Sequence, residues 1–90
     1  MSKAVVKLDW NNATHESGIK LYNVYQDNIL IYQTTDTKYN VYDVEKPKTF
    51  SFFVVALSYS GDYLKSNIIT VLTKDIAGFK SLNYTLNFSI

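Results

Sequence analysis

Apolar and polar side chains alternate along most of the chain with a period of two residues, and a helical period of 3.6 residues is hard to find. In the first such stretch Val6, Leu8 and Trp10 alternate with charged residues, which is typical of a β-strand with one buried face. Further apolar or alternating stretches follow at 22–25, 29–32, 39–41, 50–57 and 68–72. Short strands at a spacing of roughly ten residues predict an all-β protein, an antiparallel sandwich or barrel.

Polar residues separate these stretches and predict the turns. Asp27 and Asn28 tolerate positive φ angles, so this pair is expected to close a tight hairpin between two of the strands. Residues 58–67, around Gly61, are expected to form a loop.

Several of these stretches together resemble the fibronectin type III family, from about residue 5 to residue 73. The stretch 6–10 is similar to the second strand of that family with its core tryptophan, 22–25 to the Tyr-x-Val-Tyr of the third strand, and 37–41 to the fifth strand. The best match lies at 44–56. There the residues that fall in register with the family pattern Leu-x-Pro-Gly-Thr-x-Tyr-x-Val-x-Val-x-Ala are Val44, Phe50, Phe52, Val54 and Ala56. The resemblance implies a two-sheet antiparallel sandwich.

The chain departs from the family pattern in three places. Phe50 stands where the family has a corner tyrosine, so one hydrogen bond of about 1 kcal/mol is missing there. Only four residues precede Val5, so the first strand is expected to be short or missing. Residues 75–90 lie beyond the last strand of the family.

The end of the chain carries its clearest alternation. The apolar positions there are Leu82, Tyr84, Leu86, Phe88 and Ile90. A strand with so apolar a face is not left in water. We therefore expect 82–90 to form an extra C-terminal strand that extends a sheet edge within the molecule, in place of the first strand, or extends the sheet of a neighbouring molecule by β-augmentation. The expected organisation is a sandwich over 1–74 and an extension over 75–90 in the same domain.

The strand at 50–57 is apolar on both faces. If its even-numbered residues point into the core, Phe53, Val55 and Leu57 point outward, beside Leu21 and Tyr25 of the neighbouring strand. These five residues form what we call the outer-face patch. Large apolar patches usually mark a contact, so the patch is a candidate interface, covered either by the tail of the chain or by another subunit or protein.

Composition and charge narrow the classes of partner. The chain has 90 residues, enough for one domain. The hydrophobic share of 47% argues against disorder. A net charge of +1 does not favour a nucleic-acid or membrane partner, and the apolar runs are too short to span a bilayer. We therefore expect a protein partner or self-association.

Little in the sequence points to catalysis or to a bound cofactor. His15 is the only histidine and is expected to be a solvated loop residue. Without cysteine, an ordinary structural zinc site is unattainable. No acidic cluster with metal-ligand spacing and no glycine-rich phosphate loop is present in the sequence. We expect no enzyme activity, no metal and no cofactor.

The loop around Gly61 is a weaker recognition candidate. Tyr59, Asp62 and Tyr63 lie there, and tyrosine offers contact area at a low entropy cost. The alternative is that one or both tyrosines fold back on the edge of the sandwich. The family sometimes carries an Arg-Gly-Asp tripeptide in this loop, but this chain has no arginine, so integrin binding is not expected.

These observations favour a non-catalytic protein-interaction or structural module. The first residues lack a secretion signal, because Lys7 and Asp9 interrupt the apolar run. The most concrete version is a small phage or prophage virion component that is made and assembled without export. The first alternative is an extracellular spacer or accessory domain cut from a secreted bacterial enzyme or adhesin. The second is a small carbohydrate-binding module.

Overall fold

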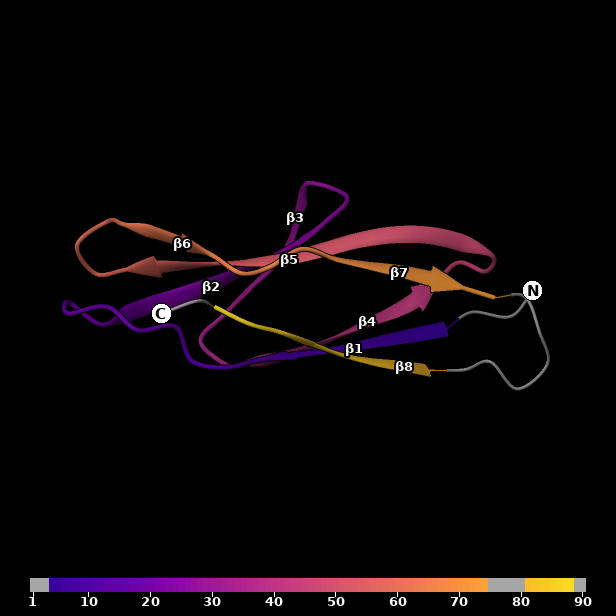
Figure 1. The fold of residues 1–90 in the computed structure, drawn as a ribbon, viewed down its shortest axis with the longest axis horizontal. Helices are drawn as coiled ribbons and strands as arrows, with labels where there is room; N and C mark the ends of the chain where they lie inside the picture. The colour runs from indigo at the N-terminus through magenta and orange to yellow at the C-terminus, as the bar shows by residue number, and fades with distance from the viewer. Residues whose placement is uncertain (1–3, 75–80, 89–90) are drawn as a thin grey trace.

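The computed structural model describes residues 4–74 and 81–88. These residues form eight β-strands joined by turns and loops, and they include no helix (Figure 1). The strands are β1 (Ala4–Trp10), β2 (Ile19–Gln26), β3 (Ile29–Thr34), β4 (Lys38–Val44), β5 (Lys48–Ser58), β6 (Tyr63–Lys65), β7 (Ile69–Thr73) and β8 (Ser81–Leu86). One sheet has the order β4-β1-β8 and the other the order β3-β2-β5-β6, with β7 also paired to β5. The predicted all-β sandwich of two sheets is confirmed.

The core lies between the two sheets and is built from the alternate positions that the sequence predicts. Phe52, Val54 and Ala56 of β5 are fully buried, and Val6 and Leu8 of β1 face them from the other sheet. Trp10 is 4% exposed, and the centroid of its ring lies 5.7 Å from that of Tyr22. These contacts between residues far apart in sequence supply most of the hydrophobic stabilisation of a domain of this size.

The β2–β3 hairpin closes at the predicted pair. Asp27 and Asn28 have φ angles of 51° and 67°, the positive values that a two-residue hairpin turn requires at both central positions. Asp27 also ties the turn to β5, because its backbone N–H donates to Ser51 O and its Oδ1 accepts from Ser51 N, each at 2.9 Å.

The segment expected to be a loop at 58–67 contains a further strand. Gly61, at φ 92°, allows a tight turn in which Ser58 N donates to Asp62 O at 2.9 Å. The turn sends the chain back along β5, so β6 pairs there with Val55, Ala56 and Leu57. Three residues are too few for a visible alternation, which is why the sequence pattern missed β6.

The described part of the C-terminal extension pairs within the molecule. β8 lies along β1 from Val5, opposite Ser81, to Trp10, opposite Leu86, and so completes the three-stranded sheet. Leu86 is fully buried and Phe88, just beyond the strand, is 5% exposed. Of the two expectations for this strand, extension of an edge within the molecule is the one observed; Ile90 and residues 75–80 lie outside the described residues.

The pairing of β1 with β8 is parallel, whereas the sequence analysis expected antiparallel pairs throughout. Figure 1 shows the reason. β7 ends at the end of the molecule where β1 begins, and β8 starts from that same end in the opposite sheet. β8 must then run in the direction of β1.

Candidate binding site

Two segments that are distant in sequence meet at one end of the sandwich. Ile19, at the start of β2, is the register partner of Ser58, at the end of β5. The loop before β2 and the turn after β5 therefore emerge side by side. A hydrogen bond of 3.1 Å from Tyr59 N to Gly18 O joins them directly. We call this surface, residues 11–20 and 58–63, the loop end.

His15 links the two loops and is not the solvated residue that the sequence analysis expected. Its Nε2 lies 2.8 Å from Oδ2 of Asp62, and its side chain is only 17% exposed. Its Nδ1 accepts a hydrogen bond from Ser17 N at 3.1 Å and lies 2.8 Å from Ser17 Oγ. The expectation was wrong because the pairing of β2 with β5 brings a carboxylate to the imidazole, which no local pattern reveals.

Serine hydroxyls extend this network across the β5–β6 turn. Ser17 Oγ accepts from Ser60 N at 3.2 Å, and the hydroxyls of Ser58 and Ser60 lie 3.1 Å apart. Asp62 N donates to Ser58 Oγ at 3.0 Å. Both loops are thus held by several bonds that share partners, an arrangement that fixes their relative position.

Ser17, His15 and Asp62 have the composition of a catalytic triad, but their surroundings are those of a loop brace. Here Ser17 Oγ accepts a hydrogen bond from Ser60 N. The backbone N–H and the hydroxyl of Ser17 both contact Nδ1 of His15. None of the three residues lines the pocket at this end of the molecule. These bonds account for the order of the two loops.

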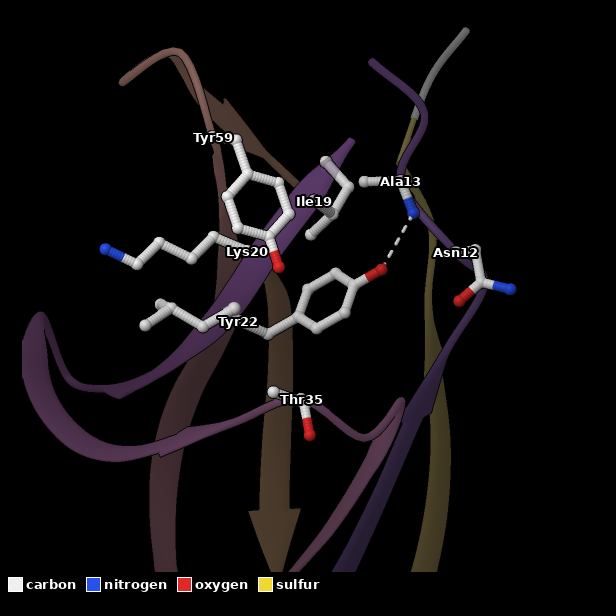
Figure 2. Close-up of a pocket in the computed structure, with 8 residues that line it drawn as sticks. Asn12, Ala13, Ile19, Lys20, Tyr22, Thr35 and Tyr59 are labelled. Carbon is white, nitrogen blue, oxygen red and sulfur yellow. Dashed lines mark hydrogen bonds between the residues drawn. The ribbon is translucent and has the colours of Figure 1, made fainter. Parts of the chain in front are cut away.

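A pocket of about 370 Å³ opens beside the two loops. Its lining residues are Asn12, Ala13, Ile19, Lys20, Leu21, Tyr22, Thr35 and Tyr59. Figure 2 shows the rings of Tyr22 and Tyr59 on one side, Asn12 across from them, and Lys20 extended outward at the rim. The hydroxyl of Tyr22 accepts a hydrogen bond from Ala13 N at 3.1 Å, so the floor is tied to the loop that forms one wall.

The three residues predicted for loop recognition are only partly brought together. Tyr59 lines the pocket, Asp62 bonds to His15, and Tyr63 lies outside the pocket at the start of β6. Tyr59 and Tyr63 are 68% and 69% exposed. Tyr59 leans over Gly18, where an added Cβ would lie 3.4 Å from its ring, yet most of its surface stays open to solvent.

Apart from Leu21, which the sequence placed in the outer-face patch, the other pocket residues were not predicted to belong to a site. Asn12, Lys20, Tyr22 and Thr35 come from two loops and one strand, and no spacing motif connects them. The one local signal is Lys20, a charged residue between two apolar residues at the start of β2.

The outer-face patch is less exposed than its outward position in the strands predicts, because neighbouring side chains of the same sheet cover part of it. Tyr25 stacks on Phe53 with ring centroids 4.8 Å apart, and Lys65 Nζ lies 4.3 Å from the centroid of the same ring. Phe53 is consequently 9% exposed, and the other four patch residues, Leu21, Tyr25, Val55 and Leu57, are half-buried.

The described part of the tail does not cover this patch. Residues 81–88 lie along β1, whereas the patch is on the outer face of the sheet that contains β2 and β5. The expectation that the tail covers the patch is therefore wrong for these residues, and cover by another subunit or protein is the remaining alternative.

Within the described ranges, no three His, Asp or Glu side chains gather closely enough to hold a metal ion. The same residues include no helix of the length and apolarity that crossing a membrane requires. Comparison with known proteins finds no matching family model, no matching curated protein and no matching solved structure.

Proposed function

We propose that the chain is a non-catalytic interaction module that binds a protein partner through its loop end. The observation that carries this proposal is that the loops are held in place by hydrogen bonds while two of their tyrosines are exposed. The link from His15 to Asp62 and the bond from Ala13 to Tyr22 hold the loops, while Tyr59 and Tyr63 stand in solvent beside a pocket.

The physical reason is the cost of ordering side chains and loops on binding. Each rotamer-rich side chain that a partner immobilises costs about 0.5–1.5 kcal/mol, so loops that are fixed beforehand bind more tightly for the same contacts. Tyrosine adds to this, because it presents a large, amphipathic surface with few rotatable bonds. Loops held on a rigid sandwich are also where binding residues concentrate in folded domains.

The strand order supports the resemblance to the fibronectin type III family as part of this proposal. The segments similar to the second and fifth strands pair as β1 and β4, and the segment similar to the third strand pairs with β5. A small virion component is the setting we favour, with an accessory domain of a secreted bacterial enzyme or adhesin as the alternative. A carbohydrate-binding module is less favoured, because no carboxylate of the described residues lines the pocket.

Site-directed photo-crosslinking in extracts of the cells that produce the protein tests the proposal. A photoreactive side chain replaces Tyr59 in one variant and Tyr42 in a control. Tyr42 is 65% exposed, close to the value for Tyr59, but lies on β4. We expect a product of defined mass with the first variant and not with the second. Identical products from both positions, or none from Tyr59, would contradict the proposal.

A further inference from the structure

We propose that the pocket at the loop end takes a carboxylate group of the partner protein, a side chain or a chain terminus. This inference rests on the proposed function, because it names the chemistry by which the loop end recognises its partner. The argument comes from the polar groups that line the pocket and from one buried hydroxyl.

The described residues that line the pocket carry groups able to donate hydrogen bonds and include no acid. Tyr22, Tyr59 and Thr35 contribute hydroxyls, and Asn12 contributes an amide. The one charged residue of the lining, Lys20, pairs with no carboxylate in the described part of the chain. An acceptor-rich, negatively charged group matches this set better than a cation or an apolar side chain does.

Tyr22 supplies the most specific part of the argument. It is 4% exposed, and its hydroxyl oxygen accepts from Ala13 N at 3.1 Å. No hydrogen bond donated by this hydroxyl is found among residues 4–74 and 81–88. A buried O–H normally finds an acceptor, and at a pocket floor that acceptor comes from water or from a ligand. A carboxylate oxygen makes the stronger bond, because hydrogen bonds to charged groups are stronger than neutral ones.

The size and charge of the site favour a carboxylate over a phosphate. A volume of about 370 Å³ accommodates a single acidic side chain. Phosphate, with up to two charges, is usually held by several cations or by a cluster of backbone N–H groups. This lining has one lysine, whose ammonium extends outward in Figure 2 and so adds attraction at the rim more than a fixed contact.

The acidic residues near the loop end lie outside the pocket lining. Asp62 bonds to His15 and does not line the pocket. Asp36 and Glu16 are exposed residues outside the lining. None of these three carboxylates lines the pocket, so a bound anion meets the tyrosine hydroxyls on its walls (Figure 2) and no acid of the described residues.

An NMR titration of the intact chain with small probes tests the proposal. The two carboxylate probes are N-acetyl-glutamate α-amide, which carries a side-chain carboxylate, and N-acetyl-alanine, which carries a terminal one; N-acetyl-glutamine α-amide is the neutral control. We expect either carboxylate to shift the amide resonances of Ala13 and Lys20 with millimolar affinity, and the neutral amide to bind at least tenfold more weakly. The probe that binds more tightly identifies the source of the carboxylate. Equal binding of the neutral amide, or tighter binding of inorganic phosphate, contradicts the proposal.

Variants separate the pocket from the rest of the surface. Lys20→Gln is expected to weaken carboxylate binding about threefold, and the matched variant Lys7→Gln, an exposed lysine on the other sheet, to leave it unchanged. Tyr22→Phe is expected to weaken binding about tenfold, and Tyr59→Phe, with a hydroxyl at the exposed rim, by less. If Lys20→Gln and Lys7→Gln behave alike, the site is not the one proposed. These small probes need no partner, so their failure leaves the crosslinking result at Tyr59 standing, and failure at Tyr59 leaves the titration interpretable.

Discussion

Nε2 of His15 lies 2.8 Å from Oδ2 of Asp62, although the two residues are 47 positions apart in the sequence. The contact exists because β2 begins beside the end of β5, so the loops that flank these strands share one end of the sandwich. The imidazole is thus one of several groups that join the two loops, beside the bonds from Tyr59 N to Gly18 O and from Ser60 N to Ser17 Oγ.

Replacing that imidazole should loosen the loop end while leaving the sandwich folded. We expect His15→Ala to lower the free energy of unfolding by about 1 kcal/mol, the net value of an ordinary hydrogen bond, because Asp62 is largely exposed. Hydrogen exchange of the amides of Gly18 and Ser60 should accelerate. The control Glu16→Ala, an exposed neighbour, should change neither quantity. Unchanged exchange in His15→Ala would show that the other bonds hold the loops without it.

Trp10 should be essential to the core. Its ring is 4% exposed and contacts Tyr22, so Trp10→Ala is expected to cost about 3–5 kcal/mol, enough to unfold a domain of this size. Its Nε1 has no hydrogen-bond partner within the described residues, so Trp10→Phe should cost less than Trp10→Ala. Chemical denaturation gives both values. Free quenching of Trp10 fluorescence by iodide in the folded protein would contradict this placement.

β8 should contribute to stability through the residues that face the core. Leu86 is fully buried, so Leu86→Ala is expected to cost about 2–5 kcal/mol. Asn83 is exposed on the same strand, and Asn83→Ala should stay within about 0.5 kcal/mol of the parent. Urea denaturation curves compare the two variants. Equal effects of the two substitutions would mean that β8 is not packed on the core in solution.

The outer-face patch should make little contribution to association. Phe53 is already covered by Tyr25 and Lys65, and Val55 is half-buried. We therefore expect the intact chain and Val55→Lys to sediment with the same monomer mass across a range of concentrations. A mass that rises with concentration in the parent, and returns to the monomer in Val55→Lys, would restore the patch as a self-association surface.

The strands and the core could be predicted from the sequence because period-two alternation is a local property. Val6, Leu8 and Trp10 needed no knowledge of their partners to be assigned to the core face, because charged residues alternate with them. The turn at Asp27 and Asn28 was equally local, since it depends on two residues that tolerate positive φ.

The loop end could not be predicted in the same way, because its contacts join residues that only the strand pairing brings together. His15 looked like a solvated side chain since its partner lies in another loop. The direction of β8 was hidden for a related reason. It depends on the end of the sandwich at which β7 stops, and alternation is the same for parallel and antiparallel strands.

The central claim is that the loop end is the binding surface. The most direct measurement is a chemical-shift map of the isotope-labelled chain, recorded with and without the partner captured at Tyr59. We expect the largest shifts on the pocket lining and the β5–β6 turn, including Lys20 and Tyr59. The amides of Phe53 and Val55 on the outer-face patch should barely move. Shifts centred on the outer-face patch, with the loop end unperturbed, would contradict this claim.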